Sequence, residues 1–220
     1  MYNKSRPFNF QAMRIMAQRD QKKSRYDLAL ITGASSGIGA LTAKKLAAEG
    51  LRVLLVARRK ERLEQLAEEI RAGGGWAEIF AADLSRQNDR ESVIQFARSH
   101  GELDVLLNNA GFGWHGWFDE IGWQQAEEML KINIDAGVHL TSAFLPEMMA
   151  RKRGHIIFLG SIAGDIPSRG IGLYSGTKAF TDALVTGLYR ETRRSGVHVS
   201  VVKPGPVKSE FFEVGLNKSN

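Results

Sequence analysis

The stretch Leu28-Ala-Leu-Ile-Thr-Gly-Ala-Ser-Ser-Gly-Ile-Gly39 decides the fold of this chain. It begins with an apolar run, which is typical of a strand buried on both faces, and a helical pattern follows it to about Glu49. Glycines between a strand and a helix allow a tight turn and let the backbone approach a pyrophosphate at the helix N-terminus. The stretch therefore predicts a strand, a phosphate-binding turn and a helix.

The rest of the chain repeats this alternation of apolar runs and amphipathic stretches. Strands that are each followed by a helix indicate a parallel sheet covered on both faces, and right-handed crossovers make it doubly wound. We predict a single Rossmann-like α/β domain over residues 26–220, with strand order 3-2-1-4-5-6. Strands are expected at residues 28–32, 53–57, 77–82, 103–108, 155–160 and 197–202, and the later helices at about 60–71, 83–100, 124–151 and 174–194, with Pro146 breaking or kinking the third.

Tyr174 and Lys178 lie four positions apart, a spacing that places both side chains on one face of a helix. A phenol is a poor acid or base at neutral pH, and an ammonium beside it lowers the phenol pKa. A hydroxyl such as that of Ser161 could hold a substrate oxygen while the phenol moves a proton. The three residues indicate proton transfer to or from an alcohol or carbonyl, although such a pair also occurs on helix surfaces and such a serine also caps turns.

The residues after the second predicted strand bear on the choice of cofactor. A carboxylate there would bind the 2′-hydroxyl of NAD, but this chain has Arg58 and Arg59. A guanidinium suits a 2′-phosphate, so we favour NADP(H) over NAD(H), with Arg58 as the preferred contact. The alternative is that the arginines merely begin a solvated helix, and for Arg59 the two interpretations are evenly balanced.

The net charge of +6 belongs to the N-terminal arm, residues 1–25. The chain has 30 basic and 24 acidic residues, and the arm holds seven of the basic and one of the acidic residues, so the remainder is neutral. A nucleic-acid partner is therefore not expected for the domain. We favour a solvated tail for the arm, while an interfacial helix and an organelle-targeting segment remain alternatives.

Composition excludes several classes of site. The chain has no cysteine, so disulfides and thiolate chemistry are excluded, and its five histidines show no ligand spacing, so no metal site is predicted. No apolar run approaches the length of a membrane span, and we expect no membrane partner. The lack of disulfides fits a reducing compartment, and we expect a cytoplasmic location.

Seven motifs together resemble the short-chain dehydrogenase/reductase family over roughly residues 26–213. The resemblance implies an oxidoreductase that transfers hydride between NADP(H) and a small carbonyl or alcohol substrate, and a homodimer or homotetramer is compatible with it. The alternative is a non-catalytic dinucleotide-binding protein. The motifs are Thr32–Gly39, Asp83-Leu84, Asn108-Asn-Ala-Gly111, Asn133, Ser161, Tyr174 with Lys178, and Pro204-Gly205.

The resemblance also implies residue roles. Tyr174 would be the general acid or base, Lys178 would lower its pKa and bind the nicotinamide ribose, Ser161 would hold the carbonyl oxygen, and Asn133 would bind a relay water. Family members usually continue beyond Pro204-Gly205 to a seventh strand, which we expect to be missing here. The implied cofactor contacts are Gly33, Ser35, Ser36, Gly37, Ile38, Gly39, Arg58, Asp83, Leu84, Asn109, Ala110, Gly111, Tyr174, Lys178, Pro204, Gly205, Val207 and Ser209.

Overall fold

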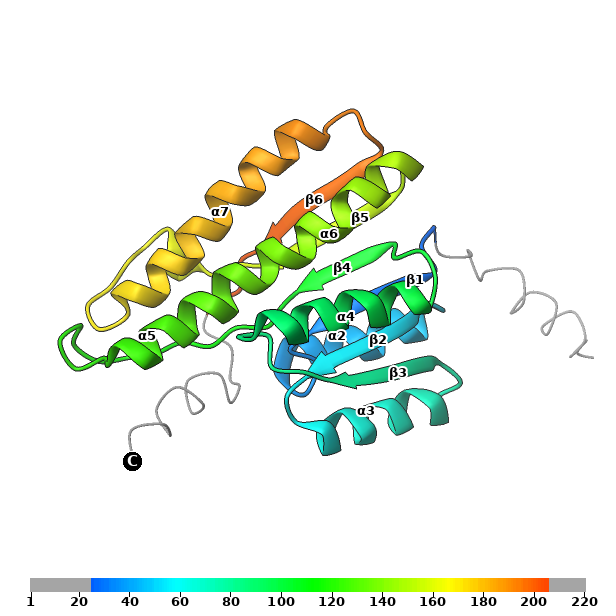
Figure 1. Ribbon diagram of the computed structural model, residues 1–220, viewed down its shortest axis with the longest axis horizontal. Helices are drawn as coiled ribbons and strands as arrows, with labels where there is room; N and C mark the ends of the chain where they lie inside the picture. The colour runs from blue at the N-terminus through cyan, green and yellow to red at the C-terminus, as the bar shows by residue number, and fades with distance from the viewer. Residues whose placement is uncertain (1–24, 206–220) are drawn as a thin grey trace, which may run out of the picture.

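The computed structural model describes residues 25–205, which form one parallel sheet with helices on both faces (Figure 1). The strand order is β3-β2-β1-β4-β5-β6, and every neighbouring pair is parallel. This architecture confirms the predicted doubly wound fold. The strands are β1 (Leu28–Thr32), β2 (Arg52–Ala57), β3 (Trp76–Ala81), β4 (Val105–Asn108), β5 (Gly154–Leu159) and β6 (Val197–Val202).

At least one helix joins each pair of consecutive strands, as parallel pairing requires. No helix in the part of the chain that the structure describes is long and apolar enough to span a membrane. The N-terminal arm up to residue 24, the expected loss of a seventh strand, and Val207 and Ser209 all lie outside that part. The helices are α2 (Gly37–Ala48), α3 (Lys60–Ala72), α4 (Gln87–Ser99), α5 (Trp123–Leu130), α6 (Ala136–Arg151) and α7 (Gly172–Thr192), with a π-helical turn η1 (Lys131–Asp135) and a 3₁₀ turn η2 (Ile162–Gly164).

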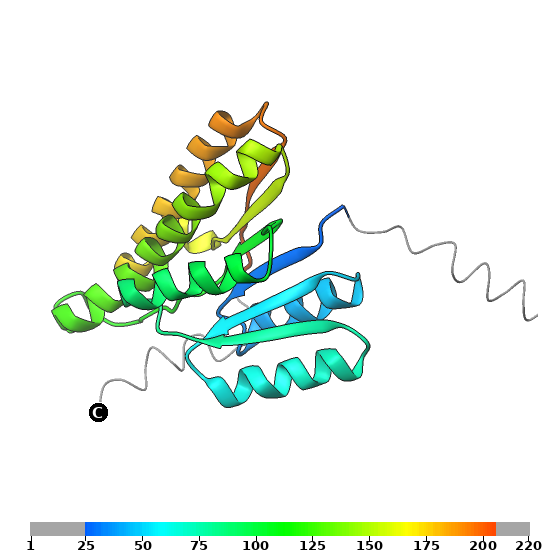
Figure 2. The same ribbon diagram turned by 45° about the vertical axis from the view of Figure 1, so that its right-hand side comes forward.

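The sheet separates two apolar cores, because successive strand residues point to opposite faces. Helices α4, α6 and α7 cover one face of the sheet, and α2 and α3 cover the other (Figure 2). Leu28 and Leu30 pack into the first core, whereas Ala29 and Ile31 pack into the second. All five residues of β1 are buried. Burial on both faces explains why this strand has a continuous apolar sequence rather than an alternating one.

Several elements begin or end one to four residues away from the predicted bounds, and two of the differences concern β4 and the helix after it. Strand β4 begins at Val105 rather than at residue 103, and Asp104 lies just before its amino end, where its side chain accepts hydrogen bonds from the Asp27 N–H and Arg153. The helix expected over residues 124–151 is interrupted by η1 and not at Pro146, which lies inside α6. Buried Leu140 and Phe144 pack α6 against the sheet around the proline, and this packing offsets the missing N–H donor.

Candidate active site

A cleft of about 510 Å³ lies at the carboxyl ends of the strands, where the strand order reverses between β1 and β4. A crevice at this point of an open α/β sheet is the usual ligand site. It brings together most of the residues predicted from the sequence. The predicted residues that line it are Gly33, Ser35, Ser36, Gly37, Ile38, Arg58, Asp83, Leu84, Asn109, Ala110, Gly111, Ser161, Tyr174, Lys178, Pro204 and Gly205.

The glycine turn forms one wall of the cleft and requires its glycines. Gly33 has a φ of +65°, and a Cβ there would lie 2.8 Å from Asn109 Nδ2. A Cβ on Gly39 would lie 2.5 Å from the carbonyl oxygen of Gly33, so Gly39 packs α2 against the turn and does not line the cleft. The first turn of α2 holds no acidic residue, which leaves its N-terminus suited to an anion.

Thr32 joins the glycine turn to the end of β4, a role that the sequence analysis missed. Its hydroxyl oxygen accepts hydrogen bonds from the backbone N–H groups of Asn109 and Ala110, both at 3.0 Å, and donates to the carbonyl oxygen of Leu107 at 3.2 Å. The Asn109 amide in turn donates to the carbonyl oxygen of Thr32 at 2.8 Å. These contacts hold the two loops on either side of the switch point in one arrangement.

The two arginines after β2 both line the cleft but point to different partners. Nη2 of Arg59 donates to the hydroxyls of Ser35 at 3.0 Å and Ser36 at 2.9 Å, so its guanidinium lies on the glycine turn. Arg58 forms an ion pair with Glu128 of α5, with 3.1 Å between Nη1 and Oε1. The structure therefore favours Arg59 at the turn more strongly than the sequence analysis did.

Asp83 lies at the far end of the cleft, after β3. Burial raises the pKa of its carboxyl group. Hydrogen bonds from Ser85 and the charges of Arg58 and Arg86 together lower this pKa by more, so that it lies below its usual value. The Ser85 backbone and hydroxyl donate to Oδ1 at 3.1 and 2.8 Å. The carboxylate is ionised at neutral pH and held in one orientation.

Ser161 and Tyr174 meet at the other end of the cleft. Ser161 follows β5 and caps η2, since its Oγ accepts from the Ala163 N–H at 3.1 Å. Its side chain is also hydrogen-bonded to the phenol of Tyr174. Burial raises the pKa of Tyr174, and the Ser161 hydrogen bond only partly offsets this, so the phenol holds its proton at neutral pH. We expected Lys178 to lower the pKa of Tyr174. The net shift of this pKa is upward instead, because burial of the phenol is the largest influence on it.

Lys178 lies one helical turn after Tyr174 and is only 5% exposed. Its Nζ donates to the Leu159 carbonyl oxygen at 2.7 Å and lies 5.7 Å from the centre of the Tyr174 ring. Burial lowers the pKa of Lys178 to about 8, against an opposing influence of Asp182. The two side chains share a helix face, as the spacing predicted.

Asn133 lies in η1 and ties the loop after β4 to α7. Its Oδ1 accepts from the Phe112 N–H, and its Nδ2 donates to the Phe112 carbonyl oxygen, both at 3.0 Å, and to Thr177 Oγ1 at 3.1 Å. Asn133 does not line the large cleft but borders a separate cavity of about 10 Å³ together with Lys178, Thr181 and other residues. A cavity of this size with polar walls can hold one water molecule.

Comparison with known proteins agrees with this geometry. The family profile described as short chain dehydrogenase matches residues 27–218. The chain belongs to the short-chain dehydrogenase family. An uncharacterized oxidoreductase from Staphylococcus epidermidis is 32% identical over 192 residues, which cover 87% of this chain and 82% of the relative.

Solved structures of short-chain dehydrogenases also resemble this protein. A metagenomic short-chain oxidoreductase in complex with NADP is 40% identical with a TM-score of 0.78, and the match covers 83% of each chain. A short-chain dehydrogenase/reductase from Burkholderia phymatum in complex with NAD is 26% identical with a TM-score of 0.81, and the match covers 86% of this chain and 69% of that one. Both likenesses support the short-chain dehydrogenase fold.

The arrangement also indicates which chemistry this dehydrogenase can perform. Residues 25–205 contain no cluster of histidine, aspartate or glutamate side chains that could hold a metal ion. The cleft instead combines a glycine turn at the N-terminus of α2 at one end with a buried phenol, a hydroxyl and an ammonium at the other. Such a site can bind an elongated phosphorylated ligand and move a proton at its far end.

Proposed function

We propose that this protein is an NADP(H)-dependent oxidoreductase that interconverts a carbonyl compound and the corresponding alcohol. The observation that carries the proposal is the hydrogen bond between Ser161 and the buried phenol of Tyr174 at the end of the cleft, with Lys178 on the same helix face. A proton donor held by a hydroxyl and an ammonium is what carbonyl reduction requires.

The residues of the cleft fit a dinucleotide. The turn at Gly33 and Gly37 has backbone angles that favour glycine, with φ values of +65° and +54°, and it leads directly into the N-terminus of α2. We assign the pyrophosphate to this turn, the adenine to Asp83 and Leu84, and the nicotinamide end to Pro204 and Gly205. When bound, the cofactor supplies the hydride.

The residues of the protein supply the proton and the orientation. Ser161 hydrogen-bonds the substrate carbonyl oxygen, and Tyr174 donates its proton to that oxygen as the alcohol forms. In the oxidative direction Tyr174 takes the proton back, and the Lys178 ammonium stabilises the phenolate. General acid catalysis of this kind contributes roughly 10²–10⁴-fold to the rate. The small cavity between Asn133 and Lys178 supports a water that returns protons to the pair.

Two arginines support NADP(H) over NAD(H). Arg59 lies on the glycine turn and Arg58 lines the same part of the cleft, and guanidinium groups bind phosphate oxygens through paired hydrogen bonds. The metagenomic relative, which is 40% identical, was solved with NADP, whereas the relative solved with NAD is 26% identical.

The substrate end of the cleft supports an apolar carbonyl compound. Ile162, Ile166 and Ile171 line the cleft on the Ser161 and Tyr174 side. Apolar walls with few polar groups favour ligands whose reacting carbonyl is their main polar group. We therefore propose a ketone or aldehyde with hydrophobic substituents.

An assay with a substrate panel tests the proposal. The purified protein is mixed with NADPH or NADH and a series of apolar ketones and aldehydes, and oxidation of the cofactor is followed by absorbance. We expect carbonyl-dependent oxidation that is faster with NADPH, and Tyr174→Phe serves as the control for background oxidation. Binding of NADPH without turnover of any carbonyl or alcohol would instead favour a non-catalytic dinucleotide-binding protein.

A further inference from the structure

A cluster of three charged residues joins α7, the helix that carries Tyr174 and Lys178, to two neighbouring segments. Nζ of Lys203 lies 2.9 and 3.0 Å from the two carboxylate oxygens of Asp165 and 3.0 Å from Oδ2 of Asp182. The ammonium thus binds two carboxylates at once. None of the three residues lines the cleft, so the cluster is adjacent to the site and not part of its surface.

Each member of the cluster belongs to a segment that carries part of the site. Asp165 follows η2, the turn that Ser161 caps. Asp182 lies one helical turn after Lys178 in α7, and Lys203 directly precedes Pro204 at the end of β6. A single ammonium therefore connects the Ser161 turn, the catalytic helix and the loop after β6.

The backbone around Asp182 leaves room for its carboxylate. The side chain of Asp182 is 18% exposed, and both of its carboxylate oxygens are buried. A Cβ on Gly164 would lie 2.9 Å from Oδ2, and a Cβ on Gly160 would lie 3.4 Å from Oδ1. The Cβ at position 164 would also lie 2.9 Å from the backbone carbon of Lys178, so glycine permits η2 to lie directly on α7 beside the acid.

Charge connects the cluster to the catalytic lysine. Burial lowers the pKa of Lys178, whereas the Asp182 carboxylate raises it. Hydrogen bonds to Asp165 and the ion pair with Asp182 raise the pKa of Lys203, which remains an ammonium and counters part of the negative charge. Tyr174 and Asp182 are thus the titratable groups beside Lys178 on its own helix, and Lys203, itself paired with Asp165, faces Asp182 from the end of β6.

We propose that Asp182 and Lys203 are positioning residues, which hold the Ser161 turn against α7 and set the charge beside Lys178. This proposal rests on the proposed function, because the charge beside Lys178 matters for turnover only if Lys178 takes part in the reaction. Neither residue touches the cleft, so both act through Ser161 and Lys178.

The test compares Asp182→Asn with Lys203→Met, which remove opposite charges. Loss of the carboxylate should shift the titration of Lys178 to lower pH by about one unit, a tenfold change in its protonation ratio. Loss of the Lys203 ammonium should shift it to higher pH, because Asp182 then acts on Lys178 without a counter-charge. Both variants should lower kcat, since both release the Ser161 turn. A merely structural role would give no opposite shifts.

Two readouts separate failure of this proposal from failure of the proposed function. The pH profile of kcat is measured with a substrate found in the panel. The rate at which an amine-reactive reagent modifies Lys178, followed by mass spectrometry across pH, requires no turnover and tests the cluster even if no substrate is found. If Asp182→Asn does not fold, Lys203→Met carries the test through its shift to higher pH.

Two further variants serve as controls. Lys203→Arg keeps the charge and should retain a wild-type titration and most of kcat. Lys44→Met removes another lysine, from the exposed Lys44–Glu69 ion pair between α2 and α3, and should leave both unchanged. Shifts in the same direction for Asp182→Asn and Lys203→Met, or no shift in either, would overturn the proposal.

Discussion

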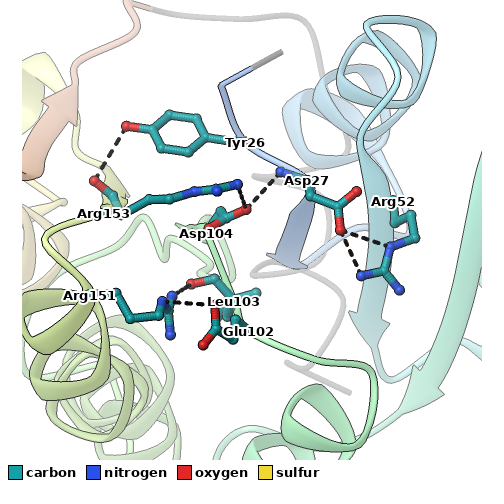
Figure 3. A network of polar contacts seen from close by, with 9 residues as sticks. Tyr26, Asp27, Arg52, Glu102, Leu103, Asp104, Arg151 and Arg153 are labelled. Carbon is teal, nitrogen blue, oxygen red and sulfur yellow. Dashed lines mark hydrogen bonds and ion pairs between the residues drawn. The ribbon is translucent and has the colours of Figure 1, made fainter. Parts of the chain in front are cut away.

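Both ends of the sheet contain a buried charged group, but the partners of that group differ between the two ends. At the amino end, Asp104 is 3% exposed and accepts hydrogen bonds at 2.7 Å from both the Asp27 N–H and Arg153 Nη2 (Figure 3). At the carboxyl end, Lys178 donates to a carbonyl oxygen and its pKa is lowered to about 8. A buried carboxylate with its donors in place is a structural group, because removal of one partner leaves the other unpaired, whereas a buried ammonium with a shifted pKa can take part in proton transfer.

The amino end forms a continuous network around this pair. Arg52 binds the Asp27 carboxylate through Nε at 3.2 Å and Nη2 at 2.8 Å, and Arg151 donates to the Leu103 carbonyl oxygen at 2.8 Å (Figure 3). These contacts join the starts of β1, β2 and β4 to the loop between α6 and β5. The comparison teaches that buried charge by itself does not mark an active site, since the partner and the resulting pKa decide its role.

The largest expected effect is on catalysis at the carboxyl end. Tyr174→Phe removes the proton donor and should reduce kcat by roughly 10²–10⁴-fold. Because the phenyl ring retains the packing of Tyr174 against Phe112 and Met129, the free energy of unfolding should change little. Turnover and urea unfolding are measured on the same sample, and near-normal turnover would disprove the assignment.

At the amino end, a substitution should lower stability and leave cofactor binding nearly unchanged. Asp104→Ala removes a buried carboxylate from two donors and leaves Arg153 without this partner, which should lower the free energy of unfolding by about 3 kcal/mol. NADPH affinity should stay within about twofold of wild type below the unfolding transition, since the change lies at the opposite end of the sheet. A large loss of NADPH affinity with intact stability would remove the distinction between the two ends.

Burial of Lys178 at the carboxyl end of the sheet should make the free energy of unfolding depend on pH. The pKa of this group is about 8 in the folded protein and 10.5 in an ordinary environment, so the unfolded chain binds more protons between these values. Stability should therefore rise with pH across that window, by an amount of the order of 3 kcal/mol, while activity that needs the ammonium falls as pH rises through about 8. Urea unfolding at several pH values measures the rise, which Lys178→Met should abolish.

The smallest effect concerns the two arginines of the cofactor end. Arg59→Ala should weaken NADPH binding by about tenfold and NADH binding little, since a charge-assisted hydrogen bond contributes roughly 1.5–3 kcal/mol. Arg58→Ala is the matched variant and should have a smaller effect, because Glu128 holds this side chain in an ion pair. Fluorescence titration with both cofactors measures the ratio, and equal losses for NADPH and NADH would contradict the preference for NADP(H).

Much of the fold could be predicted because its signals are local. The apolar run of β1 and the glycine turn after it depend on burial and on backbone angles that only a few residue types tolerate, and both were confirmed. The position of η1 could not be predicted, because Asn133 meets its partners in other segments of the chain there. The same holds for the pKa of Tyr174, which the depth of its burial decides.

By itself, the sequence determined the parallel sheet, the glycine turn before α2 and the shared face of Tyr174 and Lys178, since periodicity and glycine spacing act over a few residues. Only the tertiary structure decided that Arg59 lies on the turn while Arg58 binds Glu128, and that Lys203 binds Asp182. These contacts join segments that are distant along the chain, and their geometry depends on how the helices pack against the sheet.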